Sequence, residues 1–289
     1  MSGMTGDVHY ETYDVVEIDE PAEAVRRITL NRPDKRNALS HPLRGQLLQA
    51  LREGDADPDV RVQIVRGAGS CFSAGYDIGG GNAGHPMPFY TAEGEGDWPR
   101  HVTEGWMSIW DLAKPVIAQV HGYCLAGGSE LATCCDLVYM AEDAQMGYPA
   151  VRFGVPDMHF HAWFIGPRKA MEMMLTGDSI SGTEAVALGW ANAAVPADEL
   201  ESTVLAVAER IAKMPPDLVR LNKRIVHRGM EVMGLRTAIR VGTELCALGT
   251  HQKSMRAFVH KASTEGLTSA LDERDGRFGD YRTSGSGEH

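Results

Sequence analysis

Two glycine-rich stretches decide how this 289-residue chain folds: FSAGYDI at residues 72–78 and GYCLAGGSE at residues 122–130. Each follows a β-like run, VRVQIV at residues 60–65 and VIAQV at residues 116–120. A strand that passes through a bare glycine turn into a helix leaves backbone N–H groups unpaired and aims the positive end of the helix dipole at any ligand there. Two such turns facing each other give two donors to one developing oxyanion. The pattern therefore predicts an enzyme that stabilises an enolate or a tetrahedral intermediate.

The same stretches resemble a known family. F-S-A-G-x-D-I, and H-G-x-x-x-A-G-G-x-E-L followed by C-D-L-V, are similar to the two signature segments of the crotonase superfamily, the enoyl-CoA hydratases and isomerases. Further similar stretches follow in the same order: ITLNRPDKRNAL at 28–39, AKPVIAQVHG at 113–122 and LTGDSISGTEAVALGWANAAVP at 175–196. TEGLTSALDERDGRF at 264–278 is a looser match. The resemblance extends over nearly the whole chain.

The order of the expected elements predicts an α/β core followed by a helical region. Strand-like runs alternate with helical ones, and Ser40 and Ser181 have the sequence context of helix N-caps. From Glu199 onward the pattern is helical, with a break at Pro215 and Pro216. The resemblance implies that residues 10–198 form a crotonase (ClpP-like) spiral of ββα turns with the acyl-CoA site. It also implies that residues 199–289 form a C-terminal helical trimerisation region.

The helical region itself predicts contacts between subunits. Apolar residues recur at helical spacing, more of them than one small core could cover. They are Leu200, Val204, Leu205 and Val207, and later Leu218, Leu221 and Ile225. We therefore expect a homotrimer or a dimer of trimers.

Composition limits the partners and the compartment. The net charge is −11 without a basic stripe, which argues against binding to nucleic acid or to an anionic membrane. No run approaches the length of a membrane span, and the first residues lack the basic and apolar regions of a signal peptide, so we expect a cytoplasmic protein. Five cysteines without metal spacing are expected as reduced, mostly buried thiols. We expect no metal and no cofactor, with coenzyme A present only as part of the substrate.

The resemblance assigns the oxyanion donors by position: the backbone N–H groups of Tyr76 and Gly127. Because only the backbone is used, a tyrosine at position 76 is compatible with this chemistry; two ordinary tight turns are the alternative. Coenzyme A is a polyanion and the chain is acidic, so its cations must be local. Lys35 and Arg36 are expected at the phosphates, and the backbone near Ala74 at the adenine. The full set of expected coenzyme A contacts is Lys35, Arg36, Ala38, Ala74, Tyr76, Asp77, Ile78 and Gly127.

Glu130 is the expected acid/base. It follows Gly127 by three residues, about one helical turn, so its carboxylate can point back towards Cα or Cβ of a bound thioester. A helix cap or a dipole partner is the alternative role. Hydratases of the family use a second glutamate after the proline of a G-x-P-E segment, but this chain reads MGYPA at residues 146–150, with Ala150 in its place.

The segment that follows is also altered and supports a second hypothesis. The family's glycine-rich I-P-G-x-G-G is replaced by GVPDMHFH at residues 154–161. Asp157, His159 or His161 could supply a nucleophile or activate water, as in a crotonase-fold hydrolase acting on a thioester or on a C–C bond of a 1,3-diketone. Asp157 also suits a helix cap, and the two histidines a metal pair without a visible third ligand. A non-catalytic acyl-CoA-binding member is a third hypothesis.

Residues 79–100 are rich in glycine and proline. Beside the expected site, such a segment is either a substrate-side flap or a variable surface loop. Its aromatic residues Phe89, Tyr90 and Trp98 suit a bulky or ring-bearing substrate, or simple packing.

Overall fold

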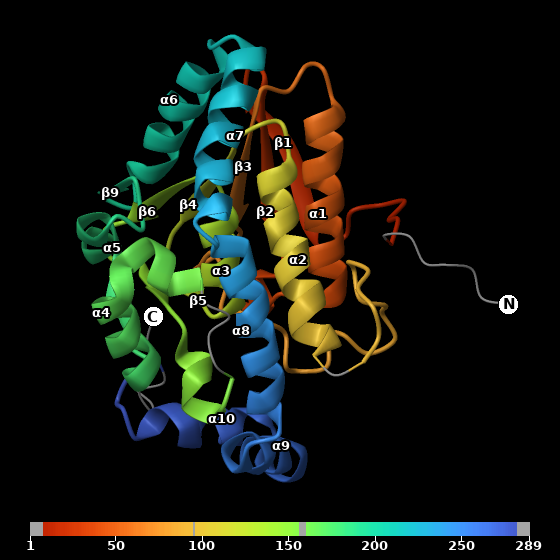
Figure 1. The fold of residues 1–289 in the computed structure, drawn as a ribbon, viewed down its shortest axis with the longest axis vertical. Helices are drawn as coiled ribbons and strands as arrows, with labels where there is room; N and C mark the ends of the chain where they lie inside the picture. Colours follow the sequence, from red (N-terminus) through yellow and green to blue (C-terminus); the bar gives the residue numbers. More distant parts are fainter. Residues whose placement is uncertain (1–7, 95, 156–159, 282–289) are drawn as a thin grey trace, which may run out of the picture.

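The computed structural model describes residues 8–94, 96–155 and 160–281. Within these residues, six strands form the larger sheet in the order β1–β2–β3–β4–β6–β9, antiparallel between β1 and β2 and parallel elsewhere (Figure 1). They are β1 (Val16–Ala22), β2 (Val25–Leu30), β3 (Val62–Gly67), β4 (Val116–Val120), β6 (Leu137–Ala141) and β9 (Ala193–Val195). All five residues of β4 are buried, as expected for a central parallel strand that is covered on both faces.

A smaller sheet lies beside the larger one and has the order β5–β7–β8 in the described residues. Its strands are β5 (Tyr123–Leu125), β7 (Gln145–Gly147) and β8 (Ser179–Ser181). After β4 the chain continues into β5 and helix α3 (Gly127–Cys134), and after β6 into β7 and the 3-10 helix η2 (Pro149–Phe153). Two successive strand–strand–helix units therefore each give one strand to each sheet.

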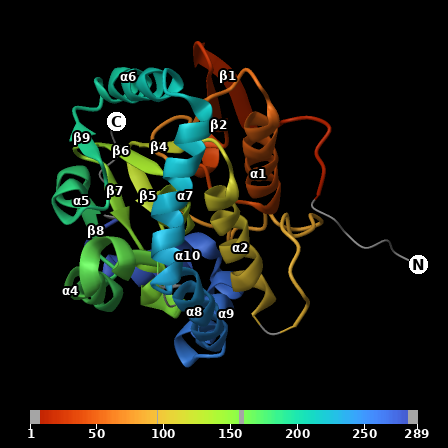
Figure 2. The same ribbon diagram turned by 45° about the horizontal axis from the view of Figure 1, so that its top comes forward.

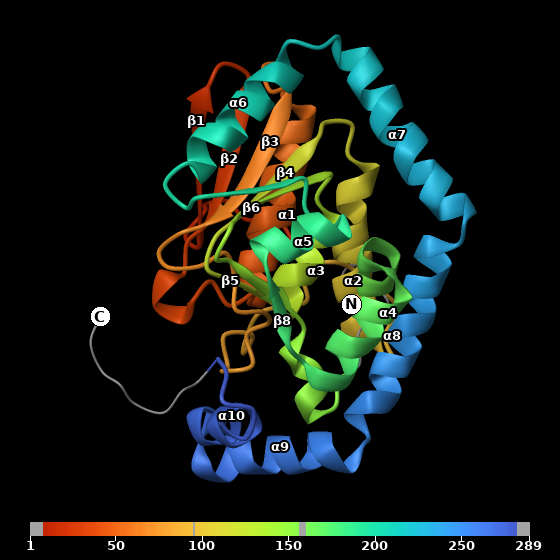
Figure 3. The ribbon, with the colours of Figure 1, turned by 90° about the vertical axis from the view of Figure 1, so that its left-hand side faces the viewer.

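Helices α1 (His41–Ala56) and α6 (Leu200–Ala212) cover opposite faces of the larger sheet (Figure 3). The hydroxyl of Ser40 accepts a hydrogen bond from the Leu43 N–H at 3.3 Å, which confirms the predicted N-cap of α1. On α6, Leu200 and Val204 are buried against the sheet. They were expected to help drive subunit contacts, and that expectation is wrong for these two residues because they complete the core of their own chain.

The remaining helices follow the predicted pattern. Four helices form an arc around the core, and the arc ends below the smaller sheet (Figure 3). They are α7 (Pro216–Val232), α8 (Leu235–Thr250), α9 (Lys253–Glu265) and α10 (Leu267–Gly276). Figure 2 shows α8 running alongside α2 (Asp97–Asp111). Helix α4 (Phe160–Thr176) is interrupted at Gly166. Helix α5 (Gly182–Leu188) starts at the predicted N-cap Ser181, which forms a capping box with Glu184.

Two expected element boundaries differ from those in the structure, and the expected state of the cysteines is confirmed. The segment expected as a loop over residues 79–100 ends at Gly96, because that glycine adopts φ 75° and α2 begins at Asp97. Strand β3 begins at Val62 rather than Val60. All five cysteines are free and buried, as predicted. Among the described helices, none is long and apolar enough to cross a membrane.

Candidate functional site

Backbone hydrogen bonds place the two glycine turns side by side. The Ser73 N–H donates to the Tyr123 carbonyl at 3.0 Å, and the Leu125 N–H donates to the Ser73 carbonyl at 3.0 Å. Gly75 has φ 106°, and a Cβ built on it would lie 3.6 Å from the Gly127 nitrogen. The turns therefore meet beyond the carboxyl ends of β3 and β4, the edge of a parallel sheet at which ligands commonly bind.

The two predicted oxyanion donors lie outside the regular backbone pairing around them. The Leu39 N–H donates to the Gly75 carbonyl at 2.8 Å, and the Asp77 N–H donates to the Leu39 carbonyl at 3.3 Å. In this parallel pairing the N–H of Tyr76, between them, points away from Leu39. Gly127 is the first residue of α3, and the first N–H groups of a helix have no intrahelical acceptor.

A cavity of about 480 Å³ opens on these turns. It contains seven of the eight expected coenzyme A contacts: Lys35, Arg36, Ala38, Ala74, Tyr76, Asp77 and Ile78. Ala150 also lines it, so the position of the family's second glutamate is an alanine facing the cavity. The expected contact that is absent from this lining is Gly127, because the side chain of Tyr76 covers it.

The side chain of Tyr76 covers Gly127 and reaches Glu130. A Cβ built on Gly127 would lie 2.5 Å from Cζ of the Tyr76 ring, so the ring rests directly on the start of α3. The Tyr76 hydroxyl donates a hydrogen bond to the Glu130 carboxylate, and the Trp106 indole N–H donates to the Tyr76 oxygen at 2.9 Å. Glu130 has no exposed surface. The side chain at position 76, which sequence reasoning treated as neutral, therefore separates the predicted acid/base from the cavity.

A buried cation lies behind this pair. The Arg44 side chain is 2% exposed, and its guanidinium carbon lies 5.7 Å from the centroid of the Tyr76 ring. Burial lowers the pKa of Arg44 to about 10, so it remains charged at neutral pH. Its Nη1 donates to His101 Nε2 at 2.8 Å, and burial, together with Arg44 and His41, lowers the pKa of His101 to about 3. His101 is therefore a neutral acceptor.

Burial and the neighbouring charges act on the pKa of Tyr76. Burial first, and then the neighbouring Glu130, raises the pKa of Tyr76 well above its ordinary value. At rest the phenol therefore keeps its proton. The Arg44 cation acts in the opposite sense and lowers the pKa of Tyr76.

The residues of the alternative hypothesis lie elsewhere or outside the described chain. Asp157 and His159 fall outside the described residues. His161 is fully buried in α4, with Nε2 3.3 Å from the Ser129 hydroxyl and its ring edge-on to Tyr148 and Trp190. Tyr148 lines the cavity and His161 does not.

The C-terminal segment closes the cavity on the side of η2, which sequence reasoning missed. Leu267, Leu271, Arg274 and Asp275 of α10 belong to its lining, together with Tyr281. Arg152 of η2 has a side chain that is 1% exposed and forms ion pairs with Asp178 at 2.9 Å and with Asp280 at 2.6 Å. The looser family match at residues 264–278 was the sequence signal for this contribution.

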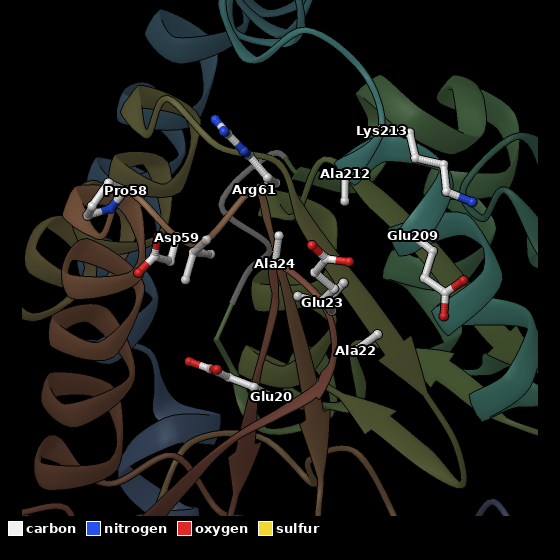
Figure 4. Close-up of a pocket in the computed structure, with 12 residues that line it drawn as sticks. Glu20, Ala22, Glu23, Ala24, Pro58, Asp59, Arg61, Glu209, Ala212 and Lys213 are labelled. Atoms are coloured by element: carbon white, nitrogen blue, oxygen red, sulfur yellow. The ribbon is translucent and has the colours of Figure 1, made fainter.

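A second hollow, of about 1070 Å³, is larger but has a different character. It lies where β2 and β3 begin, at the opposite end of these strands from the glycine turns. Figure 4 shows carboxylates and two cations spread around it: Glu20, Glu23, Asp59, Arg61, Glu209 and Lys213. Among the residues that the structure describes, no three His, Cys, Asp or Glu side chains are grouped so as to hold a metal ion.

Comparison with known proteins shows the family to which the chain belongs. A family model described as enoyl-CoA hydratase/isomerase matches residues 20–280. The enoyl-CoA hydratase domain-containing protein 3, mitochondrial, of Danio rerio is 35% identical over 259 residues, which cover 84% of this chain and 85% of that protein.

Two solved structures show the same fold. The crystal structure of an enoyl-CoA hydratase/isomerase from Xanthobacter autotrophicus Py2 has a TM-score of 0.83 and 35% identity, and covers 92% of this chain and 99% of that one. The enoyl-CoA hydratase from Mycobacterium smegmatis has a TM-score of 0.85 and 30% identity, over 96% and 98% of the two chains.

The two-sheet core, the paired glycine turns and the C-terminal helices define a mixed α/β protein with the crotonase fold. The chain belongs to the enoyl-CoA hydratase/isomerase family, whose members act on acyl-CoA thioesters.

Proposed function

We propose that this protein hydrates or isomerises an enoyl-CoA thioester through an enolate. The thioester oxygen lies between the N–H groups of Tyr76 and Gly127, and Glu130 serves as acid and base. The observation that carries the proposal is the position of the buried Glu130 carboxylate, one helical turn after Gly127 and bonded to the side chain of Tyr76. Two N–H donors aimed at a developing oxyanion, together with one positioned carboxylate, suit proton transfer next to a thioester.

The cavity supports coenzyme A as the carrier of the acyl group. Lys35 and Arg36 are exposed at its mouth, where phosphates can reach them without leaving water. The N–H of Ala74 donates to the Arg36 carbonyl at 2.9 Å, so the first glycine turn and the cationic loop form one surface. Asp77 forms an ion pair with Arg32 at 2.8 Å. The positive charge of Arg32 offsets the repulsion between the Asp77 carboxylate and the phosphates of coenzyme A.

Ala150 limits the form of the hydration reaction. A methyl group at this position of the cavity wall cannot hold or release a proton. In this proposal, a single carboxylate therefore takes one proton from water or from carbon and returns one proton to carbon. Isomerisation of a double bond needs the same two transfers and no second carboxylate.

The competing functions are outcomes of one experiment. Purified protein is mixed with a panel of enoyl-CoA thioesters of different chain length and ring content. We expect the absorbance of the conjugated enoyl thioester to change without release of free thiol. Release of thiol would instead favour the hydrolase with Asp157, His159 or His161. Neither change, with thermal stabilisation by acyl-CoA, would indicate a non-catalytic binder.

A further inference from the structure

Tyr76 occupies the boundary between the cavity and Glu130. Its partly buried side chain lines the cavity, whereas Glu130 has no exposed surface and does not belong to the lining in the described residues. The phenol hydroxyl donates its hydrogen bond to Glu130. Its ring rests on Gly127, where any side chain would collide with it. A substrate in the cavity therefore meets the tyrosine before it meets the carboxylate.

The Tyr76 hydroxyl is held in a defined position. Trp106, which is 1% exposed on α2, donates its indole N–H to the phenol oxygen at 2.9 Å. The Trp98 ring packs edge-on against the Tyr76 ring, with centroids 5.0 Å apart. A phenol oxygen has one proton and two lone pairs. With the proton directed to Glu130 and one lone pair used by Trp106, one lone pair remains for a group in the cavity.

The charges around the hydroxyl suit a proton relay. Arg44 places a buried positive charge near the ring, and its partner His101 is neutral. This cation favours the transient phenolate of Tyr76 that such a relay passes through. The indole N–H of Trp106 would stabilise the same phenolate by a hydrogen bond.

We propose that Tyr76 is the catalytic residue that contacts the reacting carbons, and that Glu130 exchanges protons with the substrate through the Tyr76 hydroxyl. This inference rests on the proposed function and adds a specific route for the proton.

The hydration step balances in atoms and electrons. A water oxygen forms a bond to Cβ and loses one proton to the Tyr76 oxygen, while the phenol proton passes to the Glu130 carboxylate. The electrons of the Cα=Cβ double bond move into the thioester enolate. Glu130 then returns its proton to the Tyr76 oxygen, the phenol gives its proton to Cα, and the enolate electrons form the new C–H bond. Tyrosine and glutamate end as they began, and the substrate has gained one water.

The alternative is that the phenol moves aside and Glu130 touches the substrate directly. That movement would break the hydrogen bonds of Tyr76 with both Glu130 and Trp106. The two routes differ in one respect that can be measured: only the relay requires the Tyr76 oxygen.

Tyr76→Phe tests the relay, because it keeps the backbone N–H and the ring and removes only the hydroxyl. With the enoyl-CoA that wild type converts best, we expect kcat to fall about 10²–10⁴-fold, the typical effect of losing a positioned proton donor. Binding of a saturated acyl-CoA, measured by calorimetry, should change by less than about threefold, since it needs no proton transfer. Tyr139→Phe, on β6 and outside the cavity lining, is the matched control and should retain wild-type kcat.

A double variant separates the relay from two independent roles. If both groups serve one route, Tyr76→Phe combined with Glu130→Gln should be about as slow as the slower single variant. Tyr76→Phe within tenfold of wild-type kcat, alongside a slow Glu130→Gln, would overturn the relay and leave the proposed function intact. Failure of wild type to convert any enoyl-CoA would overturn both.

Discussion

The ammonium group of Lys223 lies 2.9 Å from the carboxylate of Asp136 and joins helix α7 to the core. The same group donates to the carbonyls of Ile109 at 3.0 Å and Lys114 at 3.1 Å, so all three of its protons are used. Asp136 in turn accepts the N–H of Val116, at the start of β4, at 2.7 Å. A buried charged pair therefore ties helix α7 of the C-terminal region to the centre of the sheet.

Replacing Lys223 by methionine should strongly destabilise the fold. The variant keeps most of the side-chain volume but leaves the Asp136 carboxylate buried beside His227 without its ammonium partner. Breaking a buried pair in this way costs about 3–5 kcal/mol. We expect a loss of that size in urea unfolding, whereas Lys213→Met, at a position away from this pair, should change stability by less than about 0.5 kcal/mol. Equal stability of both variants would contradict a structural role for the pair.

Stability should fall with decreasing pH, partly because of His101. Its pKa is about 3 in the folded protein, against about 6.5 in an unfolded chain. Between these values the unfolded state binds the additional proton, so the free energy of unfolding falls as pH is lowered from about 6.5, by at most about 1.4 kcal/mol per pH unit for this group. Burial lowers the pKa of His41 and His227 as well and adds a slope of the same sign.

His101→Gln isolates this contribution. The glutamine oxygen can still accept from Arg44, but it does not titrate. We expect urea midpoints measured from pH 7 to pH 4 to decline less steeply in His101→Gln than in wild type. Parallel curves for the two proteins would show that His101 protonates equally in the folded and unfolded states.

The outer face of α7 predicts self-association. Its buried positions, Lys223 and His227, are polar, and its apolar side chains face outward. The exposed set is Leu218, Leu221, Ile225 and Val226, with Val232 at 89% exposure. So large an apolar surface is typical of an interface. We expect trimers or dimers of trimers by light scattering at micromolar concentration, and smaller species for Ile225→Asp but not for Asn222→Asp, on the same helix. A monodisperse monomer of wild type would contradict this prediction.

The sequence predicted the elements whose cause is local. Ser40 and Ser181 begin helices through contacts within a few residues, and their caps are present as expected. The glycine turns were recognisable because consecutive small residues directly after a strand are typical of a tight turn and not of a continuing strand. Cap and turn positions can therefore be predicted from the sequence without knowledge of the tertiary structure.

The parts that the sequence did not reveal depend on contacts between distant segments. Nothing local indicates that Tyr76 bonds with Glu130, 54 residues further on, or that Trp106 of α2 supports the same hydroxyl. The apolar spacing of α6 and α7 looks alike, yet one helix buries its face on the sheet and the other exposes it. Periodicity identifies an apolar face, but only packing decides what covers it.

Replacing Glu130 by glutamine should separate turnover from binding. The substitution keeps the shape and a hydrogen-bond acceptor for Tyr76 but removes the ability to hold a proton. Ala150 offers no second carboxylate to share the work, so kcat should fall about 10²–10⁴-fold. Affinity for acyl-CoA, which depends on contacts such as Lys35 and Arg36, should change by much less than tenfold.

Two further variants complete this test. Glu209→Gln, at an exposed position outside the 480 Å³ cavity, should keep wild-type kcat and is the matched control. His161→Ala should alter stability more than chemistry, because His161 is buried beside Ser129 and Trp190 and does not line the cavity. Wild-type kcat in Glu130→Gln, together with its loss in a folded His161→Ala or in Asp157→Asn, would move the chemistry to residues 154–161 and favour hydrolysis.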